Sequence, residues 1–88
     1  GLFRGKRAAE KITLQVSPDS WLKEYLPKYP IHSSQKQKDA HTYELHLEIN
    51  QDLENFLFRY ASELQVIEPI QLRIQLKENL NKALQSYQ

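Results

Sequence analysis

The stretch that decides the fold is residues 64–69, LQVIEP, in a chain of 88 residues. Its apolar residues are bunched as in a buried strand, and the proline stops the run. Immediately afterwards an apolar stripe with intervals of three and four residues predicts a final helix of about four turns or more. The stripe consists of Leu72, Leu76, Leu80, Ala83, Leu84 and Tyr87. We expect this helix either to cover the sheet or to reach for a partner.

Upstream of this stretch, segments with the two-residue period of a strand alternate with segments that have the three-to-four-residue period of a helix. Residues 11–17, KITLQVS, alternate with period two and predict a strand. Residues 17–27 predict a short helix, with Ser17 as N-cap and Pro18 at the first helical position. Four residues of that segment fall on one side of the predicted helix: Trp21, Leu22, Tyr25 and Leu26.

The middle of the chain contains a second, clearer strand, in which Tyr43, Leu45, Leu47 and Ile49 point one way. Residues 31–36 are polar and predict a weakly patterned edge strand, joined to it through a turn at Lys38 and Asp39. Residues 50–63 return to helical spacing, with Asn50 as N-cap. The apolar stripe of this helix is Leu53, Phe56, Leu57 and Tyr60.

The order of elements predicts an α+β domain with a ferredoxin-like βαββαβ two-layer sandwich and an additional C-terminal helix. Right-handed crossovers would place the first two helices on one face of an antiparallel sheet. The other face would then be polar and mildly anionic, formed by Thr13, Gln15, Glu44, His46, Glu48 and Gln65.

Composition narrows the class of protein. The length fits one domain, and the absence of cysteine excludes disulfides and thiolate metal sites. No apolar run is long enough for a membrane span, so we expect a soluble, cytoplasmic protein. The net charge of +1 conceals a basic first half and an acidic second half. That asymmetry indicates either that the basic first half binds an anion or that its charges are ordinary surface charges that keep the domain soluble.

Three segments resemble the WCX domain, the C-terminal extension of bacterial transcriptional regulators that carry a helix-turn-helix domain and a WYL domain. They are GLFRG, which resembles the exit from the WYL domain, ITLQVSPDSWLKEYLP, and LQVIEPIQLRIQLKENLNKAL. The segment from Val66 to Arg73 is the most specific. Many relatives have glycine before the last strand where this chain has Ala61. The resemblance divides the chain into a linker over residues 1–10 and a WCX-like domain over residues 11–88.

This resemblance implies a non-catalytic regulatory or oligomerisation domain. Its partners would be the WYL and helix-turn-helix domains of the same chain, further copies of the parent protein, and DNA through the parent. The effector sensed would be a nucleic acid or nucleotide. The alternative is a small-molecule sensor of ACT type, which has the same strand and helix order, and a single-strand nucleic-acid binder is a third reading.

Candidate site residues follow from charge and periodicity. Arg4, Lys6 and Arg7 form a basic cluster that could bind phosphates, or a solvated hinge between domains. Ile70 and Ile74 lie off the main stripe of the last helix and predict a protein interface.

Other patterns favour structural interpretations. The alternating side chains of Glu44, His46 and Glu48 could bind a metal ion, but such alternation is typical of the solvent-exposed face of a sheet. The aromatic residues could stack on bases of a single-stranded nucleic acid, but they lie on apolar stripes and are interpreted as core; they are Trp21, Tyr25, Tyr29 and Tyr43. The chain has no phosphate-binding glycine loop and no nucleophile motif, so we expect no enzyme, cofactor or metal.

Overall fold

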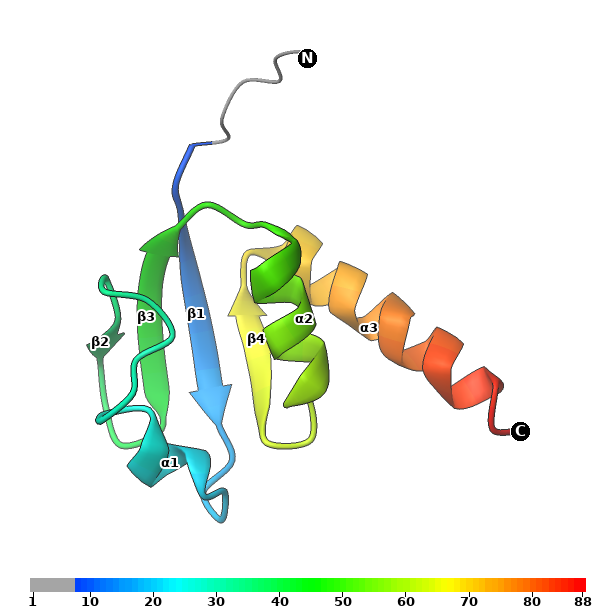
Figure 1. The fold of residues 1–88 in the computed structure, drawn as a ribbon, viewed down its shortest axis with the longest axis horizontal. Helices are drawn as coiled ribbons and strands as arrows, with labels where there is room; N and C mark the ends of the chain where they lie inside the picture. The colour runs from blue at the N-terminus through cyan, green and yellow to red at the C-terminus, as the bar shows by residue number, and fades with distance from the viewer. Residues whose placement is uncertain (1–7) are drawn as a thin grey trace.

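Within residues 8–88, four strands and three helices follow one another in the order βαββαβα (Figure 1). The computed structural model describes residues 8–88. The elements are β1 (Glu10–Val16), α1 (Leu22–Tyr25), β2 (Lys36–Gln37), β3 (Thr42–Leu47), α2 (Gln51–Arg59), β4 (Leu64–Glu68) and α3 (Ile70–Gln85). The chain therefore contains an α+β domain, as the alternation of periods predicts.

The four strands form one antiparallel sheet in the order β2-β3-β1-β4. β1 lies in the centre, where Leu14 is opposite Tyr43 of β3 and Val66 of β4. The register between β1 and β4 shifts at Thr13 and Leu14. One face of the sheet is therefore built from the alternate residues that the period-two pattern selects.

The core lies between that face and the helices. Ile12, Leu14 and Val16 of β1 are fully buried, and so are Tyr43 and Leu45 of β3. They form one cluster with apolar residues of all three helices: Leu22, Leu26, Leu53, Leu57, Leu72 and Leu76. All three helices thus contribute to the same side of the sheet. The predicted inward residues of β1 are confirmed, as are Tyr43 and Leu45 of β3, whereas Leu47 is only partly buried and Ile49 is buried beyond the end of the strand.

The start of α2 is also confirmed. The side chain of Asn50 accepts a hydrogen bond from the Leu53 amide at 3.0 Å, which satisfies one of the donors left free at a helix start. β4 ends at Glu68, and α3 begins one residue after Pro69. The peptide bond between Glu68 and Pro69 is cis.

The first helix is shorter than predicted and begins later. Ser17 is not its N-cap, because the Ser20 amide donates to the Ser17 carbonyl and closes a turn around Pro18. Ser20 is buried, and its hydroxyl accepts from the Leu22 amide at 3.0 Å. Proline suits the second position of a turn as well as a first helical turn, which is why the sequence pattern misplaced the helix start.

The edge strand is also shorter than predicted and shifted, because it covers only Lys36 and Gln37. Side chains replace the strand pairing expected for residues 31–36. The Gln35 side chain bonds the Ile31 amide and the Leu26 carbonyl, and Ser34 Oγ accepts from the His46 amide. The turn at Asp39 is confirmed, because its carboxylate accepts from the amides of residues 41 and 42.

Candidate functional site

Three aromatic side chains at the first helix are exposed rather than buried. Trp21, Tyr25 and Tyr29 are 49%, 43% and 60% exposed, so the interpretation of these residues as core is wrong. The buried positions of this segment are Leu22 and Leu26. A four-residue helix has one narrow buried side, and two leucines already fill it.

The exposed rings belong to a continuous aromatic cluster. Tyr25 stacks between Tyr29, at 4.9 Å between ring centroids, and Trp21, at 5.3 Å. Trp21 then meets Tyr60 at 5.7 Å, which in turn packs against Phe56 of α2 at 4.8 Å. The edge-on geometry of both Trp21 contacts is the one that aromatic quadrupoles favour. The cluster therefore holds its exposed rings in fixed positions.

A groove of about 430 Å³ lies beside this cluster. We call it the aromatic groove, and its lining includes Tyr25, Tyr29, Ile31, Leu47, Phe56 and Asp52. The wall is mainly apolar, and Asp52 at the start of α2 contributes a carboxylate to it. Rigid aromatic walls with a few polar groups are typical of surfaces that bind other molecules.

The second unusual surface is the C-terminal half of α3. Leu72 and Leu76 are buried, but Leu84 is 56% exposed, and Tyr87, two residues beyond the end of α3, is 90% exposed. Leu80 is also exposed. We call Leu80, Leu84 and Tyr87 the projecting stripe. Figure 1 shows α3 running away from α2 towards the C-terminus.

The direction of α3 explains why this stripe is uncovered. Leu57 of α2 lines a hollow with Leu72 and Leu76 in the first half of α3. Phe58 of α2 lines another hollow with Lys82 of the last turns, so α2 does not end before α3 does. α3 instead diverges from α2 towards the C-terminus (Figure 1). Its first half covers the sheet, and its last turns lie apart from it.

The residues predicted to bind or contact partners lie in two places. Ile70 and Ile74 are exposed on α3, off the buried stripe, which is compatible with the predicted interface without testing it. Arg4, Lys6 and Arg7 lie outside the described residues.

The open face of the sheet is polar but not anionic as predicted. Glu44 lies 3.7 Å from Lys11 Nζ and 3.9 Å from Lys38 Nζ, so two lysines offset the carboxylate that would otherwise repel phosphate. Glu48 follows the end of β3 and does not extend the strand pattern of Glu44 and His46. Among residues 8–88, no cluster of three potential metal ligands occurs.

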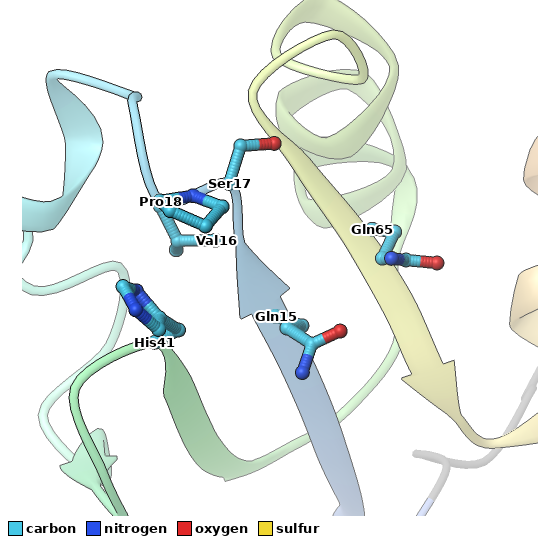
Figure 2. Close-up of a pocket in the computed structure, with 6 residues that line it drawn as sticks. All are labelled: Gln15, Val16, Ser17, Pro18, His41 and Gln65. Atoms are coloured by element: carbon cyan, nitrogen blue, oxygen red, sulfur yellow. The ribbon is translucent and has the colours of Figure 1, made fainter.

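A shallow pocket of about 260 Å³ lies where β1 leaves the sheet. Figure 2 shows its lining, with Gln15 and Gln65 on the neighbouring strands β1 and β4 and the His41 ring near Pro18. His41 Nδ1 is buried and has no hydrogen-bond partner in the described part of the chain. Amides and one imidazole can bind a neutral polar group, but this lining has no permanent charge to pair with an amino acid.

Side chains bond backbone groups of the sheet at two places. On the edge strand β4, Arg73 Nη1 donates to the Val66 carbonyl at 2.7 Å and lies 3.3 Å from the Gln65 side chain. On β3, beyond the two residues of β2, the His46 amide donates to Ser34 Oγ at 2.8 Å. A partner strand at either place would have to displace one of these bonds.

Two titratable groups have displaced pKa values. Burial raises the pKa of Tyr43, whose hydroxyl has no partner among the described residues. The His41 backbone amide, followed by hydrogen bonds from Thr42, lowers the pKa of the exposed Asp39. Neither group lines the aromatic groove, so these shifts relate to stability rather than to binding.

Sequence reasoning identified α3 but missed the aromatic groove. The available signal was the i, i+4, i+8 spacing of Trp21, Tyr25 and Tyr29, which continues past the proline that ends the helix. No helix within residues 8–88 is long and apolar enough to cross a membrane. Comparison with protein-family models, curated proteins and solved structures found no match to the chain.

Proposed function

We propose that the chain is a non-catalytic regulatory domain of a bacterial WYL-family transcriptional regulator, and that it acts through protein contacts. The observation that carries this proposal is the placement of exposed apolar side chains. Most of them lie at the aromatic cluster and along α3, whereas Ile67 is the only exposed large apolar residue on the strands within residues 8–88. The Glu44 carboxylate of the open sheet face is paired. Exposed aromatic and aliphatic patches mark contact surfaces in proteins.

The finer fold assignment belongs to the same proposal. The element order βαββαβ and the sheet order β2-β3-β1-β4 support a ferredoxin-like domain, to which α3 is added. The fold does not by itself determine a function. It does explain how a regulator can use this domain, because the sheet holds two helical contact surfaces on one rigid support.

The ACT-like alternative is less favoured by the same geometry. A sensor that joins its sheet to that of a second copy needs a free strand edge, and Arg73 occupies the Val66 carbonyl on the edge strand β4. The pocket between Gln15 and Gln65 lacks the charges that an amino-acid ligand would require. Single-strand nucleic-acid binding is disfavoured because the aromatic rings lie on the helices and not on the open sheet face.

The decisive test is the open reading frame upstream of Gly1. We expect it to encode a WYL domain and, before that, a helix-turn-helix domain. An upstream region without a recognition helix would contradict the proposal. A biochemical test uses light scattering of the chain with short oligonucleotides and with amino acids. Tight binding of an amino acid would support the ACT-like alternative instead.

A further inference from the structure

We infer that the aromatic groove binds a proline-rich segment of a partner protein, anchored by an arginine next to the prolines. The inference rests on the proposed function, in which the domain acts through protein contacts, and it names the chemistry of the segment that is contacted. Three observations carry it: the connected rings of the groove, the backbone bonds beside it and the charge of its lining.

The rings of the groove come from two elements that ring contacts join. Tyr25 and Tyr29 line the groove at the end of α1, and Phe56 lines it from α2. Phe56 packs on Tyr60 at 4.8 Å between ring centroids, and Tyr60 meets Trp21 at 5.7 Å. Trp21 in turn meets Tyr25 at 5.3 Å. A groove whose rings are already held in place loses little conformational freedom when a ligand binds.

The backbone beside the groove favours a segment that does not pair as a strand. Leu47, the last residue of β3, lines the groove. A strand added beside it would have to displace Ser34 Oγ, which accepts from the His46 amide at 2.8 Å. A polyproline segment has no amide donors to pair, and it binds by packing its rings on aromatic walls. Such a segment therefore suits this groove better than an added strand.

Asp52 gives the groove a negative charge. No lysine or arginine lines the groove, and Asp52 has no ion-pair partner within the described part of the chain. His32 adds no positive charge, because its Nδ1 accepts a hydrogen bond from the Ser34 amide at 3.1 Å. The amide dipoles at the start of α2 oppose the carboxylate with about half a positive charge, which leaves the groove anionic. A cation beside the prolines therefore completes the match.

Arginine fits this position better than lysine. A planar guanidinium can pair with a carboxylate and stack on a tyrosine face, whereas an ammonium is a compact point charge. The ring cluster already holds one guanidinium, because Arg59 Cζ lies 5.9 Å from the centroid of the Tyr60 ring. Tyr29 is 60% exposed, and its ring meets only that of Tyr25 among the described residues. Its other face therefore remains available for a second guanidinium.

NMR titration of the 88-residue chain tests the inference. The probe is a heptapeptide with one arginine between two runs of three prolines, and its matched control carries citrulline, which keeps the shape of arginine without the charge. We expect the arginine peptide to shift amide resonances around the groove, at Tyr29, Leu47 and Phe56. It should bind about tenfold more tightly than the citrulline peptide. A heptapeptide with alanines in place of the prolines should bind about fivefold more weakly, because it loses more conformational freedom.

Variants of the groove locate the contact. Tyr29→Ala should raise the Kd of the arginine peptide by about tenfold, and Asp52→Asn by about threefold, because an exposed ion pair contributes little. Asp52→Lys should instead bind a peptide with glutamate at the central position more tightly than the arginine peptide. Phe58→Ala removes an exposed ring of α2 outside the groove, and this matched control should leave the Kd unchanged. All three positions are exposed, so the variants should keep the wild-type circular dichroism.

Four results would overturn the inference. They are the absence of resonance shifts at millimolar peptide, shifts that lie outside the groove, equal affinity for the arginine and citrulline peptides, and equal affinity for the proline and alanine peptides. None of these results depends on the upstream reading frame, so the failure of the groove contact and the failure of the proposed function can be told apart.

Discussion

Replacing Tyr43 by phenylalanine is expected to stabilise the domain, which is the opposite of the usual outcome for a core substitution. Tyr43 is fully buried, and its hydroxyl has no hydrogen-bond partner among the described residues. A buried hydroxyl without a partner costs about 1–3 kcal/mol. Tyr43→Phe removes that oxygen and leaves the ring in place, so the free energy of unfolding should rise by about 1 kcal/mol.

Urea denaturation followed by circular dichroism measures this change. For a small domain, a gain of about 1 kcal/mol moves the midpoint by up to about 1 M urea, or the melting temperature by about 4–8 °C. Tyr29→Phe is the matched control, because the Tyr29 hydroxyl lies on an exposed ring and its loss should change stability by less than about 0.5 kcal/mol. A destabilised Tyr43→Phe variant would refute the reasoning, because it would mean that the hydroxyl donates or accepts a bond.

Alkaline pH gives a second readout for the same side chain. Burial raises the pKa of Tyr43 above its ordinary value of 10.0, because the folded state disfavours the phenolate. The stability that the protonated Tyr43 hydroxyl gives to the fold is therefore fully present below pH 10 and is lost as the pH rises through the folded-state pKa. Wild-type protein should lose more stability than Tyr43→Phe between pH 9 and pH 11. Equal losses would contradict the burial of the hydroxyl.

Three further predictions concern the fold. Asn50→Ala removes the cap of α2 and should lower the free energy of unfolding by about 1 kcal/mol in urea, whereas Asn50→Asp should preserve the bond to Leu53. Leu57→Ala empties a fully buried position and should cost about 2–5 kcal/mol, measured by thermal denaturation, and a cost below 1 kcal/mol would contradict that burial. The pKa of Asp39 is lowered chiefly by the His41 amide, so its contribution to stability is present above its ordinary value of 3.8 and is lost as the pH falls through the folded-state pKa. NMR titration of its carboxyl group should give a midpoint below 3.8, and Asp39→Asn should remove that part of the acid dependence.

Periodicity predicted the parts of the fold in which one face is buried. The alternation in β1 and β3 selected the inward residues correctly, because a strand with one buried face must place apolar residues at every second position. Asn50 was identified as a cap because its amide side chain can replace the missing backbone acceptor. The cap is satisfied three residues away, at Leu53, whereas the alternation is satisfied by packing between strands that are far apart in the sequence, as Leu14 and Tyr43 are.

Local patterns failed where two structures compete for the same residues. Residues 31–35 do not form a strand, because the side chains of Ser34 and Gln35 bond backbone groups as far away as His46 and Leu26. The turn around Pro18 delayed α1, since proline fits a turn and a helix start equally well. Neither competition can be settled from residue spacing alone.

The exposed aromatic groove and projecting stripe illustrate a further limit, because periodicity states which residues share a face but not what covers that face. The stripe of α3 has the same spacing in its buried half, at Leu72 and Leu76, as in its exposed half, at Leu80 and Leu84. What separates the halves is the direction of α3, which diverges from α2 towards the C-terminus (Figure 1). The angle between two helices depends on how their side chains interdigitate, and residue spacing within one helix does not determine that angle.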